Sequence, residues 1–265
     1  ADLIQKVNIY TPGVGYTLYN PADTTSKKAF SRFCSSDLPS ISAFYNALTG
    51  LGTQERIFMN GEESGIEGRA FGHIVTGTNA GTTYELPYLG KFSWENSIAS
   101  NASGDKTVVA GTDDGTDGQV YFYVGTKTNA GNEMDKAGLT NGRLYGISVT
   151  GLPAEISATV PAPNTTFSMV DLGIVKDSTG LALNNRSNAL SVTKFLRPED
   201  GAWDPSNPND FYFVTTNSFT APSRLWRLRF TDIANPENGG TITAVLDGTE
   251  GPKMMDNMVI DIFGH

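Results

Sequence analysis

The sequence of 265 residues contains very little cysteine or histidine and no long apolar run. Its one cysteine, Cys34, excludes an intrachain disulfide and a zinc site built from paired cysteines. His73 and His265 have no partner at metal-ligand spacing, so neither is predicted to be functional. Because no stretch approaches the roughly 20 apolar residues of a membrane-spanning helix, we expect no membrane span.

Charged residues are also scarce, at 18% of the chain, and they sum to a net charge of −9. No basic cluster is present, so nucleic acid is not an expected partner. The acidic excess is compatible with ordinary solubility or with divalent cations as partners. Low lysine, almost no cysteine and abundant Asn, Thr, Ser and Gly fit a secreted bacterial protein. We therefore expect an extracytoplasmic location, secreted or periplasmic.

Glycine and proline, at 29 and 13 residues, favour many short strands joined by turns. One short helix is predicted near residues 37–49, where apolar residues recur at helical spacing from Ile41 to Leu48 and Gly50 follows. Strands do not alternate with helices elsewhere, so a parallel α/β sheet is not expected. The predicted fold class is all-β.

A degenerate repeat narrows this prediction. Each copy has an apolar strand, a polar or acidic cluster at its end, a small residue and a second strand with an aromatic near its centre. Such hairpins are typical of a β-propeller, with a large β-sandwich as the alternative. We expect part of a six-bladed propeller. The copies are residues 56–64 with 68–75, 106–115 with 118–125, and 210–218 with 223–230.

The predicted last strand, residues 257–262, has no partner strand after it. An open propeller blade would expose strand edges and apolar faces. We therefore expect residues 1–265 to form a single propeller domain that is an incomplete fragment of a longer chain. Alternatively, another chain completes it.

Acidic residues stand at strand ends in and beside the repeat. Strand ends of a propeller converge on its central channel, where carboxylates repel one another unless cations or protons neutralise them. Oxygen ligands without histidine or cysteine favour Ca²⁺ or Mg²⁺ over zinc. Taken singly, pairs such as Asp113-Asp114 can equally be turn residues. The candidate metal ligands are Glu62, Glu63, Glu95, Asp113, Asp114, Glu199 and Asp256.

Three further side chains carry specific expectations. Glu95 follows Trp94 in a mostly apolar strand, where a carboxylate needs a partner. Arg197 stands beside an acidic cluster, where it can clamp a phosphate or form an ion pair with Glu199 or Asp200. Cys34 is predicted to be a small core residue and not a nucleophile.

The ordered motifs resemble the PhoX-type alkaline phosphatase and phytase-like β-propeller family over roughly residues 50–265. These motifs are NGEE (60–63), LGKFSWEN (89–96), GTDDG to GQVYFYVG (111–125), GRLYGISV (142–149), RPEDGAWDP (197–205) and DNMVIDIFG (256–264). The resemblance implies a propeller channel that holds calcium and iron ions, and an enzyme that hydrolyses phosphate monoesters. It implies metal ligands at Glu62 or Glu63, Glu95, Asp113 or Asp114, and Glu199, and a phosphate-binding role for Arg197. Arg197 and Glu199 are the predicted catalytic pair.

The sequence departs from the family at Gly61, where the resemblance places an iron-binding cysteine before the paired glutamates. This departure predicts a divergent member that binds Ca²⁺ and argues against an Fe³⁺ site like the family's. Two functions follow. One is a calcium-dependent phosphomonoesterase, favoured by Arg197 and Glu199. The other, favoured by Gly61, is a non-catalytic calcium-binding propeller at a cell surface or in an extracellular assembly.

Overall fold

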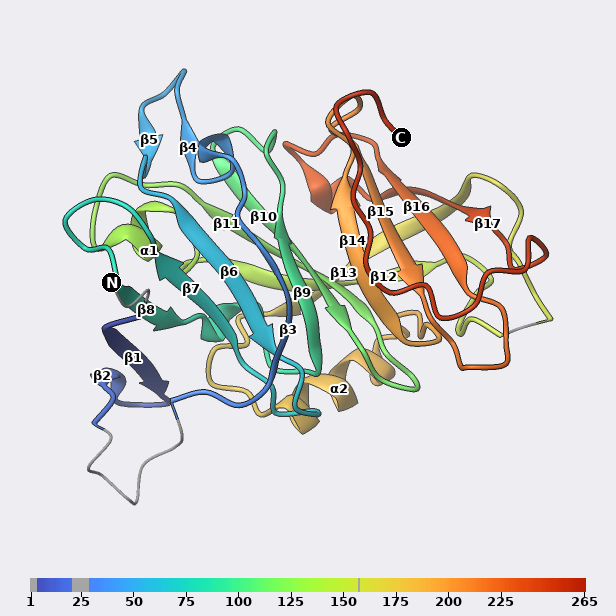
Figure 1. Cartoon of the computed structure of the whole chain (residues 1–265), viewed down its shortest axis with the longest axis horizontal. Helices are drawn as coiled ribbons and strands as arrows, with labels where there is room; N and C mark the ends of the chain where they lie inside the picture. The colour runs from blue at the N-terminus through green and yellow to red at the C-terminus, as the bar shows by residue number, and fades with distance from the viewer. Residues whose placement is uncertain (1–3, 21–28, 157) are drawn as a thin grey trace.

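The computed structural model describes residues 4–20, 29–156 and 158–265. Within these ranges the fold is all-β, with a six-stranded, a nine-stranded and a two-stranded sheet (Figure 1). The predicted fold class is therefore confirmed.

Three antiparallel units of four strands make up most of the fold. The first is β3 (Phe33–Asp37), β6 (Ile57–Glu62), β7 (Ala70–Ile74) and β8 (Thr82–Glu85). The second is β9 (Trp94–Ala99), β10 (Lys106–Asp113), β11 (Val120–Thr126) and β12 (Arg143–Val149). The third is β14 (Pro198–Trp203), β15 (Asp210–Thr215), β16 (Arg224–Phe230) and β17 (Gly240–Leu246). In each unit the predicted hairpin forms the two middle strands, so the propeller-like repeat is confirmed.

The other elements connect or extend these units. Strand β1 (Lys6–Thr11) pairs with β2 (Gly15–Leu18) and, in parallel, with β8. Strand β13 (Thr165–Gly173) joins β12 to β17, which places the second and third units in one sheet. The remaining elements are β4 (Tyr45–Asn46), β5 (Leu51–Gly52), three 3-10 turns at Ile41–Ala43, Pro87–Leu89 and Pro236–Asn238, and the helices α1 (Glu133–Lys136) and α2 (Gly180–Ala189).

The first strands of the three units lie side by side, with β9 between β3 and β14 (Figure 1). One apolar cluster, which includes Met59 and Trp94, packs the first unit against the second. Another, which includes Phe122 and Trp226, packs the second against the third. All four side chains are buried. Burial of apolar surface stabilises the folded state by roughly 25 cal/mol per Å². These two clusters therefore hold β9 close to its neighbours.

Trp94 occupies space that two glycines leave open. A Cβ added at Gly61 would lie 2.3 Å from the Trp94 Cβ, and one added at Gly111 would lie 2.6 Å from the Trp94 ring. No side chain, cysteine included, therefore fits at position 61 unless Trp94 moves.

The prediction of a helix near residues 37–49 is wrong. Strand β3 runs to Asp37, and a single 3-10 turn at Ile41–Ala43 leads into β4. Leu48, expected on the apolar face, is 96% exposed, while Phe44 is buried. The apolar residues at helical spacing therefore do not all pack on one apolar surface. Tertiary contacts decide the local structure instead. Within the described residues, no helix is long and apolar enough to cross a membrane.

We predict that Gly61→Ala lowers the free energy of unfolding by about 1–3 kcal/mol, because the added Cβ displaces Trp94. Gly115→Ala is the matched control, since a Cβ there meets no atom closer than 3.6 Å. It should change stability by no more than about 0.5 kcal/mol. Urea unfolding followed by Trp fluorescence measures both, and equal stabilities would contradict the packing argument.

Candidate metal centre

Irregular strand pairing places polar side chains at the centre of the molecule. The pairing register shifts between Phe33 and Ser36 in β3, near Gly111–Asp113 in β10, and between Pro198 and Gly201 in β14. Such β-bulges leave residues unpaired and re-aim their side chains, and they are common beside active sites. The residues at these three bulges include Cys34, Ser35, Asp113, Glu199 and Asp200.

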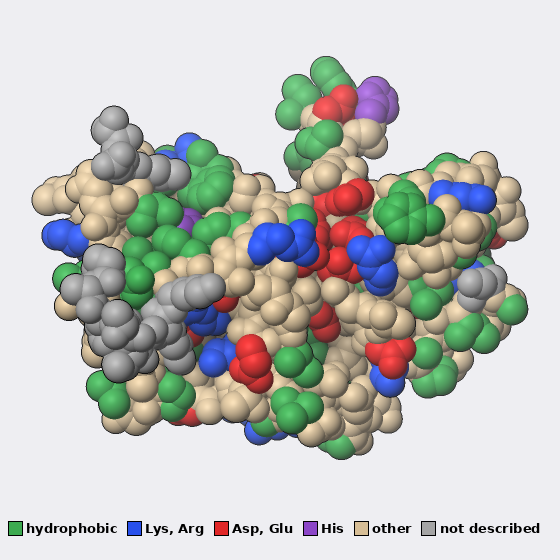
Figure 2. All heavy atoms as spheres, turned by 60° about the horizontal axis from the view of Figure 1, so that its bottom comes forward, with side chains coloured by type: hydrophobic (Ala, Val, Ile, Leu, Met, Phe, Trp, Pro, Cys, Tyr) green, Lys and Arg blue, Asp and Glu red, His purple; other side chains and the backbone are tan. Residues whose placement is uncertain are grey.

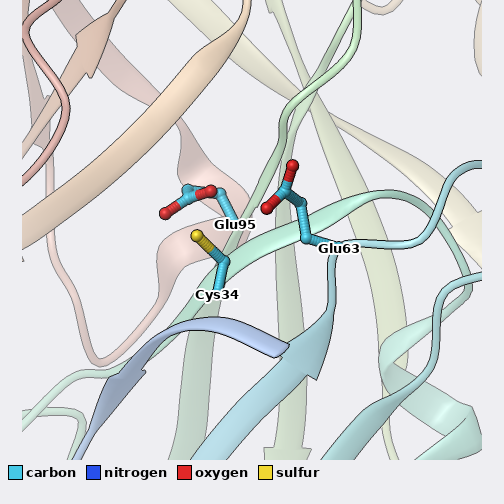
Figure 3. Close-up of side chains that lie close together, drawn as sticks. All are labelled: Cys34, Glu63 and Glu95. Carbon is cyan, nitrogen blue, oxygen red and sulfur yellow. The ribbon is translucent and has the colours of Figure 1, made fainter. Parts of the chain in front are cut away.

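The first group of potential ligands is Cys34, Glu63 and Glu95. One ligand atom from each lies within 4.8 Å of the others, and Figure 3 shows the three side chains pointing toward one another. Glu95, on β9, is 1% exposed and accepts a hydrogen bond of 2.9 Å from Ser35 Oγ. Glu63 directly follows β6 and pairs with the exposed guanidinium of Arg32. The first and second units thus both contribute to this group.

The second group is Glu95, Asp114 and Glu199, whose carboxylate oxygens also lie within 4.8 Å of one another. Asp114 follows β10, and Glu199 is a buried residue of β14. Glu95 belongs to both groups, so all three units meet at its carboxylate. Figure 2 shows acidic side chains gathered near the middle of one face of the molecule, with basic side chains beside them.

The charges of this cluster oppose one another. Burial raises the pKa of Glu95, and the charges of Glu63 and Asp256 raise it further. Burial, together with the carboxylates of Asp114 and Glu95, raises the pKa of Glu199 to about 8. Burial also raises the pKa of the Cys34 thiol, as do its contacts with Glu95 and Glu63. A bound cation would remove this penalty by stabilising the deprotonated ligands.

The donor sets fit metal ions of two kinds. The three carboxylates of the second group are hard oxygen donors, which suit Ca²⁺. The first group adds a sulfur atom, and thiolate donors suit iron and other transition metals. The residues present thus fit a metal cofactor.

Arg197 lies between two carboxylates of the second group. Its Nε and Nη2 atoms donate to Asp114 at 2.7 and 3.0 Å, and Nη2 lies 3.0 Å from Glu199 Oε1. The backbone at Arg197 is left-handed, with φ of 60°, immediately before β14. The predicted ion pair with Glu199 is present, and sequence reasoning missed the pair with Asp114. A third of the Arg197 side chain, 34%, is exposed.

The structure brings together four of the seven predicted metal ligands, namely Glu63, Glu95, Asp114 and Glu199. Glu62 is turned to Arg69, which donates from Nε at 2.9 Å and from Nη2 at 2.6 Å, both groups being buried. Asp113 accepts from the Ser93 backbone N–H at 3.1 Å and belongs to neither ligand group of the described residues.

Asp256, the seventh predicted ligand, is exposed and also lies outside both ligand groups of the described residues. Its carbonyl accepts from the Asp200 N–H at 3.3 Å, and its charge acts on Glu95 and Asp200. Asn257 beside it donates to Ser35 at 3.0 Å. The segment after β17 therefore borders the centre without completing either group.

Cys34 is the residue that sequence reasoning placed wrongly. The prediction of a core residue is contradicted, because its side chain is exposed and faces Glu63 and Glu95. The signal available was its polar setting, RFCSS, which is unusual for a core strand. Sulfur thus reaches the centre from β3, whereas position 61 has no room for a side chain.

The chain is thus an all-β, propeller-like protein. Its strand-end bulges bring carboxylates and a thiol together in a candidate metal centre. The family model of the alkaline phosphatase PhoX matches residues 46–258, and the chain belongs to this family. No curated protein sequence matches the chain.

The solved structure of Pseudomonas fluorescens PhoX in complex with the transition state analogue vanadate has a similar fold. The TM-score is 0.58 at 12% sequence identity, over 87% of this chain and 59% of that one. This chain thus spans less than two thirds of the length of that protein.

Glu62 and Glu63 are adjacent but are expected to respond differently to the same change. Glu62→Gln should lower the free energy of unfolding by about 1.5–3 kcal/mol, because it removes the charged acceptor of two buried Arg69 hydrogen bonds and leaves Glu85, at 3.5 Å, as a remaining carboxylate partner. Glu63→Gln removes only an ion pair to the exposed Arg32, worth about 0–1 kcal/mol. It should instead lower the amount of metal bound.

Urea unfolding gives the two stabilities, and mass spectrometry of the dialysed, correctly folded proteins gives their calcium and iron contents. A loss of metal in Glu62→Gln that equals the loss in Glu63→Gln would contradict these roles.

The raised pKa of Glu199 predicts a pH-dependent stability of the metal-free protein. In the unfolded chain this carboxyl loses its proton near its ordinary value of 4.5, and in the folded chain it does so at about 8. Between these values unfolding releases a proton, so stability falls as the pH rises. Urea unfolding with a chelator at about pH 5 and about pH 9 should show this fall. Glu199→Gln should reduce it, and an unchanged fall would contradict the assignment.

Proposed function

We propose that this protein is a metal-dependent phosphomonoesterase of the alkaline phosphatase type. The observation that carries the proposal is the position of Arg197, which contacts two carboxylates of the candidate metal group and keeps a third of its side chain exposed, 34%. Metal ions on one side and a guanidinium on the other would present positive charge from two directions. A phosphate dianion is the ligand that such an arrangement suits.

The family and the neighbour's bound vanadate support this reaction class. Bound metal would neutralise charge on the transferring phosphoryl group and activate an oxygen nucleophile. In this chain, Glu95, Asp114 and Glu199 would hold the metal, and Arg197 would orient the phosphate. The salt bridges of Arg197 to Asp114 and Glu199 restrict its movement, which favours one orientation of the phosphate.

We propose calcium for the oxygen-only group of Glu95, Asp114 and Glu199. Cys34 with Glu63 and Glu95 supplies the sulfur-containing set that the sequence analysis did not expect, so we propose iron as a candidate occupant there. An extracytoplasmic location forms part of the proposal and rests on the composition of the chain. The alternative function is a calcium-stabilised propeller without catalysis.

Turnover of p-nitrophenyl phosphate tests the proposal. The protein loaded with calcium and iron should release p-nitrophenol, a chelator should abolish this activity, and added metal should restore it. If chelation lowers the melting temperature but the loaded protein never turns over any monoester, the non-catalytic alternative holds.

Arg197 variants form the second arm of this test. Arg197→Ala should lower kcat/KM by about 100-fold or more while metal content stays unchanged. Arg197→Lys keeps the charge but loses the planar pair of donors, so it should recover only part of the activity. Wild-type kcat/KM in the alanine variant would refute the proposed role of Arg197.

A further inference from the structure

A cavity of about 250 Å³ adjoins the candidate metal centre. Its walls come from the loop after β6, the segment before β9, the turn between β10 and β11, and helix α2. Asp114 belongs both to this wall and to the metal group. The cavity and the metal group therefore share this residue, which places the cavity beside the centre.

The size of the cavity suits a compact group. At roughly 30 Å³ for each water in the liquid, the cavity corresponds to about eight water molecules. It is smaller than the ~300–1,000 Å³ typical of sites for drug-sized ligands. A group the size of a hexose or glycerol fits this space, whereas a nucleotide or a long chain exceeds it.

The lining combines an aromatic surface with hydrogen-bonding groups. Phe92 and Tyr121 contribute rings whose centroids are 4.7 Å apart. Around them lie Ser93, Asp113 and, on α2, Asn184. The Phe92 ring is stacked on Trp94, with ring centroids 4.0 Å apart, and also lies against Tyr121, so its faces are covered. The polar groups are what the lining offers to the hydroxyls of a ligand. Such a lining favours a hydroxylated group over a purely aliphatic one.

The lining offers a second anion few binding groups. Among the described residues that line the cavity, Lys91 is the one base, beside three acids. Two of these acids, Asp114 and Asp117, are already paired with Arg197 and Lys194. Lys91 also has Glu67 at 4.0 Å. Phosphate groups are usually bound by several converging donors of positive charge, which this cavity does not assemble. The cavity therefore gives a second phosphate on the alcohol no set of converging cations to bind it.

We propose that this cavity binds the alcohol portion of a phosphate monoester and selects compact, neutral, polyhydroxylated alcohols such as hexoses. The inference rests on the proposed phosphomonoesterase function and adds its substrate class. In this arrangement Arg197 would hold the phosphate, and the alcohol would lie in the cavity beside Ser93, Asp113 and Asn184.

Asn184→Phe tests the proposal by filling the cavity from the surface of α2. Asn188→Phe is the matched control, because Asn188 is exposed, lies one turn further along the same helix and does not line the cavity. It removes the 3.3 Å hydrogen bond that Asn188 donates to Asn184, which Asn184→Phe also removes. Phe and Asn have similar helix propensities, so both variants are expected to fold. Glucose 6-phosphate and methyl phosphate are the substrates, because both release a primary alcohol and differ in its size.

The ratio of kcat/KM for glucose 6-phosphate to that for methyl phosphate should fall at least about tenfold in Asn184→Phe. In Asn188→Phe it should stay within about twofold of wild type. Inhibition by inorganic phosphate, which needs only the metals and Arg197, should be retained in Asn184→Phe. An unchanged ratio in a folded Asn184→Phe overturns the cavity proposal and leaves the phosphatase function standing. Absence of turnover of both monoesters by wild type would instead overturn the proposed function.

A second arm uses only the wild-type protein. Fructose 6-phosphate should be hydrolysed with a higher kcat/KM than fructose 1,6-bisphosphate, because the cavity offers the second phosphate no cluster of cations. A preference for the bisphosphate would overturn the selection of neutral alcohols.

Discussion

The contact of β9 with β3 and β14 is the constraint on which the centre depends. Glu95 lies on β9 and is the carboxylate that both ligand groups share. Its burial results from the packing of Trp94 into the space above Gly61 and Gly111, since that packing brings the first strands together. If the three strands were further apart, Cys34, Asp114 and Glu199 would be separate surface groups.

That constraint creates an electrostatic conflict. Burial and the repulsion of neighbouring carboxylates raise the pKa values of Glu95 and Glu199, and Arg197 offsets only part of the negative charge at Glu199. Elsewhere the molecule neutralises a buried acid internally, as Glu62 is neutralised by Arg69. Glu62 therefore has a structural role, whereas Glu95 is a candidate ligand for a cation.

Much of the fold could be predicted from the chain, and the site only in part. The three hairpins are local in sequence, and their alternating apolar residues and turns identify them without tertiary information. The helix expected near residues 37–49 does not form. Apolar residues at helical spacing favour a helix only where they pack against an apolar surface, and Leu48 faces solvent. For neighbouring acids, strand alternation predicts that Glu62 and Glu63 face opposite ways, but not which one faces the centre.

By itself, the sequence determined the all-β class, the repeated hairpins and the placement of acids at strand ends, because each depends on patterns within about ten residues. Only the tertiary structure decided that Glu63, Glu95, Asp114 and Glu199 meet, and that Cys34 joins them from β3. It also decided that Asp114 is the main partner of Arg197. These contacts join residues that are far apart in the chain, and β-bulges whose position no local pattern reveals set their geometry.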